Sequence, residues 1–192
     1  MIRALLFLPA TGELRAGDES LVQVWRDHAD ALLWLDMVGN EKDGERRLLV
    51  DGLGLHPMAV QDAQSPRHPA KLETFDDHVF ILLKGLGADR DAFEYATIQL
   101  ALFVGERLLV TRRSDVSPSV ESLWRAVLQS PELMLRGPAG LVLQLARMMG
   151  ERYLGKLMAL EPRLEELEQA MLEHPDDAML SELTGYKTEL RK

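Results

Sequence analysis

Apolar side chains recur at steps of three and four residues between positions 142 and 171. This spacing places them on one side of a helix and is typical of a long helix with a narrow apolar seam. The predicted seam comprises Val142, Ala146, Met149, Tyr153, Leu157, Leu160, Leu164, Leu167 and Met171. An interior proline removes a backbone hydrogen bond and clashes with the preceding turn, so Pro162 is expected to kink or divide this helix. A helix of this length needs a partner for its apolar face.

A turn and a second helix are predicted after the seam. Residues 174–177, His-Pro-Asp-Asp, have the composition of a turn, and Asp176 or Asp177 is expected to cap the helix that follows. That helix presents one apolar face made of Leu180, Leu183, Tyr186 and Leu190. The two helices are therefore predicted to form a long antiparallel hairpin.

The first half of the chain has the pattern of strands alternating with short helices. Apolar runs bounded by turn residues predict strands at residues 1–8, 31–38, 79–86, 97–104 and 108–112. Helices are expected at residues 21–26, at 41–52, after His56 and after Ser117, the last two with a proline in the first turn. Strands interleaved with helices predict a layered α/β fold with a mixed central sheet.

Two parts are expected in the chain, an α/β core over residues 1–115 and a helical region over residues 116–192. No apolar run reaches the roughly 18 residues that a membrane-spanning helix needs, so this stretch is expected to be soluble and cytoplasmic. The last helical pattern reaches Arg191 and Lys192 without a glycine, a proline or a polar tail. We therefore expect the helix to continue beyond Lys192.

Composition excludes several kinds of site. The 192 residues include no cysteine, which rules out disulfides, thiolate-bound zinc and thiol catalysis in this chain. Asp and Glu number 31 against 22 Lys and Arg, a formal charge of -9, so divalent cations are more plausible partners than nucleic acid. The predicted hairpin has an acidic outer face, interpreted first as a solvated surface and second as a cation attractor. This face comprises Glu151, Glu161, Glu165, Glu166, Glu168 and Glu173.

The motifs of common enzymes are missing. The five histidines never fall four residues apart, and no glycine-rich phosphate loop or Gly-x-Ser-x-Gly turn occurs. Asp76-Asp77-His78 is interpreted first as a solvated turn before a strand, and His56 as the residue at the entrance of a helix. The chain is therefore not expected to be an enzyme.

Four short segments follow one another in a telling order. They are Trp34-Leu35-Asp36, the Leu-His-Pro-Met-Ala-Val-Gln-Asp run within residues 54–62, the Arg-His-Pro-Ala-Lys-Leu-Glu run within residues 67–80, and the hairpin at residues 103–112. Together they resemble the CorA-like family of divalent-cation transporters, in its cytoplasmic N-terminal domain. Gln61 stands where the family usually has glutamate, and one additional residue separates Arg67 from Pro69.

The resemblance implies an α/β/α sandwich, followed by a helical hairpin and the start of a stalk helix. In the family, the stalk leads to two membrane spans, five copies surround a pore, and a Gly-Met-Asn motif at its mouth selects hydrated cations. The chain is then expected to be the ion-sensing domain of a homopentamer at the cytoplasmic face of the inner membrane, with its spans beyond Lys192. Mg²⁺ is the expected regulatory and transported ion, with Co²⁺, Ni²⁺ or Zn²⁺ as further candidates.

The resemblance also implies a regulatory ion between protomers. In the family, this ion bridges a carboxylate in the loop after the central strand and one on the neighbour's stalk. The corresponding loop here is residues 85–91, in which Asp89 is the best match and Asp91 the second choice. An aspartate that bonds its own backbone in a turn is the alternative for Asp89. Removing the ion would leave the facing carboxylates to repel each other, so that intracellular ion closes its own entry route.

Two other functions stay open. One is a zinc-transporting relative on the same scaffold, and the other is a free-standing module that binds partners through its hairpin seam. A sensor should gain stability from millimolar Mg²⁺, because an ion that binds only the folded state stabilises it. An interaction module should not respond.

Overall fold

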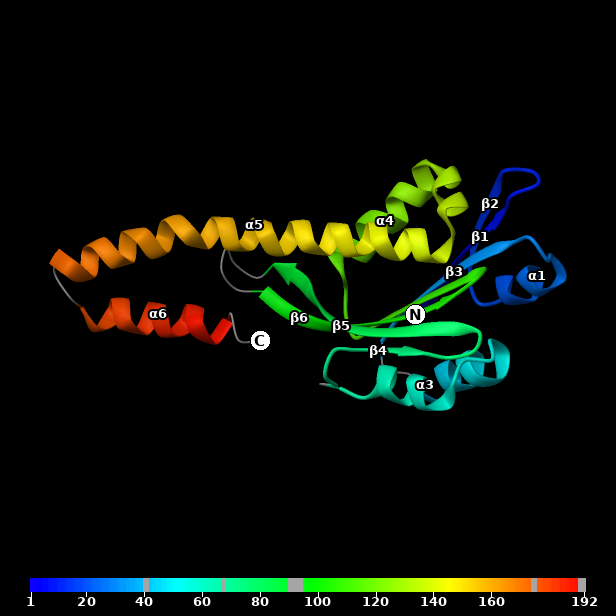
Figure 1. Cartoon of the computed structure of the whole chain (residues 1–192), viewed down its shortest axis with the longest axis horizontal. Coiled ribbons are helices and arrows are strands. Elements are labelled where there is room, and N and C mark those ends of the chain that lie inside the picture. Colours follow the sequence, from blue (N-terminus) through cyan, green and yellow to red (C-terminus); the bar gives the residue numbers. More distant parts are fainter. Residues whose placement is uncertain (40–41, 67, 90–94, 174–175, 190–192) are drawn as a thin grey trace.

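A seven-stranded mixed sheet forms the centre of the molecule (Figure 1). The computed structural model describes all residues except 40–41, 67, 90–94, 174–175 and 190–192. The strand order is β2-β1-β3-β7-β6-β5-β4, and β3 and β7 are parallel neighbours in an otherwise antiparallel set of described pairs. The strands are β1 (Ile2–Leu8), β2 (Glu13–Gly17), β3 (Leu32–Val38), β4 (Lys71–Thr74), β5 (His78–Asp89), β6 (Tyr95–Gly105) and β7 (Leu108–Arg113).

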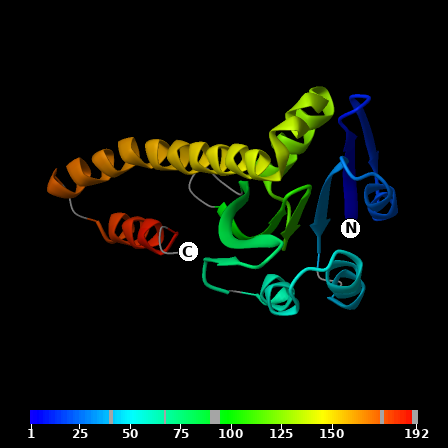
Figure 2. The same cartoon turned by 45° about the vertical axis from the view of Figure 1, so that its right-hand side comes forward.

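Helices cover both faces of this sheet, which confirms the α/β/α sandwich (Figures 1 and 2). One layer contains α1 (Leu21–Asp27), α2 (Lys42–Arg46), the π-helical turn η1 (Arg47–Gly52) and α3 (Pro57–Gln64). The other contains α4 (Pro118–Gln129), the 3₁₀ turn η2 (Pro131–Arg136) and the first half of α5 (Gly137–Glu173). The helix α6 (Asp177–Glu189) returns alongside the outer half of α5.

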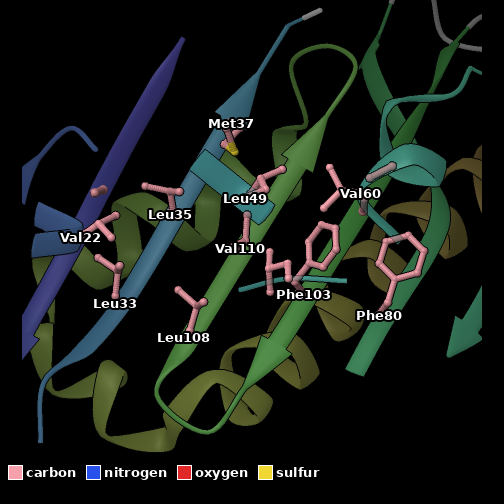
Figure 3. Close-up of a cluster of buried hydrophobic side chains, with 14 of the residues drawn as sticks. Val22, Leu33, Leu35, Met37, Leu49, Val60, Phe80, Phe103, Leu108 and Val110 are labelled. Carbon is pink, nitrogen blue, oxygen red and sulfur yellow. The ribbon is translucent and has the colours of Figure 1, made fainter. Parts of the chain in front are cut away.

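Each central strand supplies side chains to two cores, because successive residues of a strand point to opposite faces. In β3, Leu33, Leu35 and Met37 enter the core under α1, η1 and α3, as Figure 3 shows. Trp34, between them, enters the core under α4 and α5, where its ring lies edge-on to Trp124 with 5.0 Å between ring centroids. The strand therefore has no solvent-facing side, which explains its nearly continuous apolar sequence.

The two edge strands were missed by the sequence prediction. The side chains of β2, Glu-Leu-Arg-Ala-Gly, are mostly exposed, and those of β4, Lys-Leu-Glu-Thr, are exposed or half-buried. Neither strand buries an apolar face, so neither has the hydrophobic pattern on which the prediction rested. The amphipathic helix predicted at 41–52 was also wrong in detail, since α2 is followed by a π-helical turn that buries Leu49.

The long helix α5 is continuous through Pro162, so the predicted division is wrong (Figure 1). The helix curves in its outer half, where α6 packs beside it. A gradual curve accommodates a proline whose ring faces solvent, as the exposed ring of Pro162 does.

The predicted seam of α5 was partly wrong. The inner half buries Leu141, Leu145 and Met149 against the sheet, whereas Ala146 is exposed. The reason is that this half packs on a sheet. The residues that face the sheet are spaced four apart, and they start at position 141, one position earlier than the predicted seam. Farther along, Leu160 and Leu167 are buried as predicted.

The hairpin of α5 and α6 is held by a polar clamp. Arg163 of α5 makes two hydrogen bonds, of 2.8 and 2.9 Å, to the carboxylate of Glu182 in α6, and Tyr186 donates to the same carboxylate. Asp176 caps α6 by accepting a hydrogen bond from the backbone of Ala178, one of the two predicted caps. Within the described part of the chain, no helix has the length and apolarity required to cross a bilayer.

Candidate metal centre

The leading sequence candidate for an ion ligand, Asp89, is the last residue of β5, where its Cα pairs with that of Tyr95 in β6. The sequence placed it in a loop starting at Gly85, and this boundary was wrong because β5 continues through Asp89. The Asp89 side chain and the whole of Asp91 lie outside the described residues. The backbone of Asp89 therefore places the candidate at the far end of the β5–β6 hairpin.

A β-bulge precedes Asp89. The pairing of β5 with β6 shifts register between Leu86 and Asp89. A Cβ on Gly87 would lie 3.1 Å from both the Cβ and the backbone oxygen of Ala96, so glycine is the residue that fits this close approach. Bulges bend a strand and re-aim its side chains. The direction of the backbone at Asp89 therefore depends on Gly87.

The helix α5 lies against the same part of β5. The hydroxyl of Tyr153 donates a 3.2 Å hydrogen bond to the backbone oxygen of Lys84. One turn earlier, the Met149 side chain lies over Gly85, where a Cβ would come 3.3 Å from its terminal methyl group. The candidate end of β5 is thus attached to the helix that carries the hairpin.

The described residues contain no group of three or more His, Asp and Glu side chains able to hold a metal ion. Asp76-Asp77-His78, a weak candidate from the sequence, does not form such a group. Instead, Nδ1 of the buried His78 lies 2.6 Å from the carboxylate of Asp77. The rings of His56 and His78 stack on Phe75, with centroid distances of 4.4 and 4.9 Å, which gives both histidines packing roles.

Two of the segments that carried the family resemblance bind each other. Asp62, in the segment that starts α3, forms an ion pair with Lys71 of β4, and His68 lies 3.4 Å from the same carboxylate. Burial alone would favour the neutral amine, but the hydrogen bonds from Lys71 to Asp62 and Glu73 are the larger effect and raise the Lys71 pKa. These residues therefore join α3 to the sheet edge.

The Trp34-Leu35-Asp36 segment begins a buried polar network. Trp34 Nε1 donates to the hydroxyl of Thr111, which donates in turn to Asp36 Oδ1 over 2.6 Å. Arg113 donates to both oxygens of Asp36, at 3.2 and 2.8 Å. The network thus crosses from β3 to β7 inside the second core.

Two further side chains extend this network to α4. Arg3 of β1 donates to Asp36 and makes two hydrogen bonds to Glu121, and Arg113 also donates to Glu121. Burial opposes the charged forms of Arg113 and Glu121, but their hydrogen bonds and mutual charges outweigh it, so the Arg113 pKa is raised and the Glu121 pKa is lowered. The network holds the sheet and α4 together.

Sequence reasoning identified Asp36 only as part of a motif and missed Arg3, Arg113 and Glu121. A usable signal was present for Asp36, because a carboxylate inside an otherwise apolar strand needs a cationic partner. Nothing in the sequence says which of the arginines provides it.

The described architecture is that of an α/β/α sandwich from which a long helical hairpin projects. The sequence profile of the family described as CorA-like Mg2+ transporter protein matches residues 29–192. The chain belongs to this family, which confirms the resemblance found in its sequence.

Curated relatives agree with this assignment. Over 160 residues, covering 83% of this chain and 49% of the relative, the chain is 25% identical to YfjQ of Bacillus subtilis. It is 21% identical to the cobalt/magnesium transport protein CorA of Thermotoga maritima, over 94% of this chain and 52% of that protein. The chain therefore spans about half the length of the curated relatives it matches.

Solved structures show the same fold. The soluble domain of CorA from Methanocaldococcus jannaschii superposes with a TM-score of 0.75 at 24% identity, covering 96% of this chain and 70% of that one. The ZntB cytoplasmic domain from Vibrio parahaemolyticus superposes less well, with a TM-score of 0.57 at 13% identity, over 83% of this chain and 62% of that one.

Proposed function

We propose that this chain is the ion-sensing domain of a CorA-type transporter of divalent cations. The observation that carries the proposal is the family match across residues 29–192, because that family is one of Mg²⁺ transporters. Two relatives are named cobalt/magnesium transport proteins, so Mg²⁺ and Co²⁺ are the first candidate ions, with Ni²⁺ as a further one. Transport, rather than catalysis, is therefore the activity to measure.

The proposed regulatory ion binds at the end of β5, with Asp89 as the ligand from this chain and Asp91 as the second choice. Mg²⁺ keeps most of its waters and needs only one or two carboxylates from protein, so a single aspartate here and one from a neighbouring protomer suffice. The attachment of α5 to β5 at Lys84 and Gly85 supports this location, because it connects the end of β5 to the hairpin. Loss of the ion leaves two carboxylates facing each other and separates the protomers.

The assembly and location belong to the same proposal. It has five copies of the protein around a pore, this domain at the cytoplasmic face of the inner membrane, and membrane spans that follow Lys192. The division into a core over residues 1–115 and a helical region over residues 116–192 is likewise proposed. In the reading frame downstream of the Lys192 codon, the proposal requires two apolar runs of about 20 residues.

The decisive experiment is a Mg²⁺ titration of the complete gene product in detergent, followed by melting temperature and by molecular mass in solution. The proposal expects Mg²⁺ to raise the melting temperature and to favour the closed assembly. Asp89→Asn should abolish most of this response. Glu106→Gln, which changes an exposed acid in the β6–β7 turn, is the matched control and should respond like the parent. An unchanged response in Asp89→Asn rules out this ion site.

A zinc-transporting relative is the second candidate, favoured by the structural similarity to the ZntB domain. Two observations weigh against it in this part of the protein: the sequence has no cysteine, and the described residues hold no histidine cluster. Uptake of Zn²⁺ and of Mg²⁺ into proteoliposomes containing the complete gene product separates the two transporters. A free-standing interaction module, the third possibility, predicts neither transport nor a Mg²⁺ response.

A further inference from the structure

The long helix α5 is anchored at two places that are separated by an uncovered stretch. Its inner half is anchored on the sheet by Leu141, Leu145 and Met149, and burial resumes at Leu160 and Leu167 beside α6. Between the two anchors, residues 150–159 include no buried side chain. This stretch also contains two glycines, Gly150 and Gly155, which lower helix stability by roughly 1 kcal/mol each relative to alanine. The direction of the outer half therefore has few constraints from packing.

A hydrogen bond to the sheet lies inside this uncovered stretch. Tyr153 stands one helical turn beyond Met149, and its hydroxyl donates to the backbone oxygen of Lys84 over 3.2 Å. The acceptor belongs to β5, a strand that ends at Asp89 after the bulge at Leu86–Asp89. The contact thus joins the stretch of α5 without buried side chains to the segment that bends toward the candidate ion ligand.

We propose that Tyr153 is a positioning residue: its hydrogen bond to Lys84 sets the direction in which the α5–α6 hairpin leaves the sheet and passes changes at the end of β5 to that hairpin. The second half of the statement rests on the proposed ion site at Asp89. The physical reason is leverage, because a small movement at the inner end of a rigid helix becomes a large one at its far end. The clamp of Arg163 on Glu182 makes the outer half of α5 and α6 move together.

These 192 residues include no cysteine, which makes a direct distance measurement within them simple. Spin labels on cysteines replacing the exposed residues Glu106, in the turn between β6 and β7, and Glu168, in the outer half of α5, report the direction of the hairpin relative to the sheet. In metal-free protein, Tyr153→Phe should broaden and shift the distance distribution while leaving the melting temperature unchanged. Leu154→Ala, an exposed neighbour on the same helix, is the control and should keep the parent distribution. Equal distance distributions in the parent and in Tyr153→Phe would overturn the positioning role of Tyr153. Equal broadening in Tyr153→Phe and Leu154→Ala would overturn it as well.

The ion-dependent half is tested in the complete gene product, with labelled protomers diluted in unlabelled ones. Added Mg²⁺ should narrow the parent distribution and leave the Tyr153→Phe distribution unchanged. If Mg²⁺ still narrows the distance distribution in Tyr153→Phe, then Tyr153 does not pass changes at the end of β5 to the hairpin. If Mg²⁺ changes neither the melting temperature nor the distances between labels in the parent, the proposed ion site is wrong. The proposed transmission of ion binding through Tyr153 is then wrong as well. The metal-free comparison still decides whether Tyr153 sets the hairpin direction.

Discussion

Arg112 and Arg113 are adjacent in β7 and hold opposite helical layers of the sandwich. Arg112 points to the layer that contains α1, α2 and α3, where it pairs with Glu45 of α2 and donates to the backbone oxygen of Ala63 in α3. Arg113 points to the layer that contains α4 and α5, where it pairs with Glu121 of α4 and with Asp36 of β3. Because neighbouring residues of a strand face opposite ways, two consecutive arginines at the end of one strand connect all three layers.

The buried pair of Arg113 and Asp36 should be costly to break. Their side chains are 2% and 0% exposed, so replacing the carboxylate leaves two arginines, Arg3 and Arg113, with Glu121 as their one remaining carboxylate partner in the network. We expect Asp36→Asn to lower the free energy of unfolding by about 3–5 kcal/mol. Urea denaturation of the purified chain measures this loss. Glu13→Gln, which breaks an exposed pair with Arg15, should cost far less, because water screens that pair, and equal losses in the two variants would contradict the assignment.

Replacement of Leu145 tests the corrected packing face of α5. Leu145 is fully buried, whereas Leu143 on the same helix is 72% exposed. Leu145→Ala should cost about 2–5 kcal/mol through the cavity it leaves. Leu143→Ala should change stability by less than about 0.5 kcal/mol. Thermal unfolding followed by circular dichroism distinguishes them, and similar stabilities would mean that α5 faces the sheet differently.

Two glycine replacements should have effects of opposite sign. Gly87→Ala places a methyl group against the backbone oxygen of Ala96 and should cost about 1–3 kcal/mol through overpacking. Gly150→Ala in α5 meets nothing within 4 Å and should gain about 0.5–1 kcal/mol, because alanine favours the helix. Denaturant midpoints of the two variants check both signs. A tolerated alanine at position 87 would contradict the close approach of Gly87 to Ala96.

The hairpin clamp should weaken in acid. Hydrogen bonds from Arg163 and Tyr186 lower the pKa of Glu182 from 4.5 to about 2. A carboxyl whose pKa is lower in the folded state adds stability that is complete above pH 4.5 and is lost as the pH falls toward 2. An NMR titration of the Glu182 side chain should therefore show a midpoint near 2. Disruption of the pair in Arg163→Met should return the midpoint to the ordinary glutamate range, and a normal midpoint in the parent protein would refute the clamp.

The central strands were predictable because a strand that is buried on both faces has a nearly continuous apolar sequence. In β3 the run from Leu32 to Val38 is apolar except for Asp36, and both its extent and its burial were anticipated. The edge strands β2 and β4 lack this signal, since their places depend on backbone pairing with neighbours.

The details of α5 and of the ion site depend on contacts between distant parts of the chain. The row at Leu141 and Leu145 faces a sheet whose position is set by residues far earlier in the sequence, so periodicity alone located the helix but not its buried face. Asp36 and Arg113 are separated by 77 positions, and no local pattern pairs them. The assignment of Asp89 came from family resemblance, and it stays a prediction.

The parallel pairing of β3 with β7 has a consequence during synthesis on the ribosome. Leu33 pairs with Leu108 and Asp36 with Thr111, so the two halves of the sheet can join only after β7 has been synthesised. Until β7 emerges, the apolar edge of the nascent β1–β3 unit has no partner from its own chain. Long-range pairing of this kind is slow and leaves intermediates prone to aggregation, so early termination before β7 should yield a product that depends on chaperones.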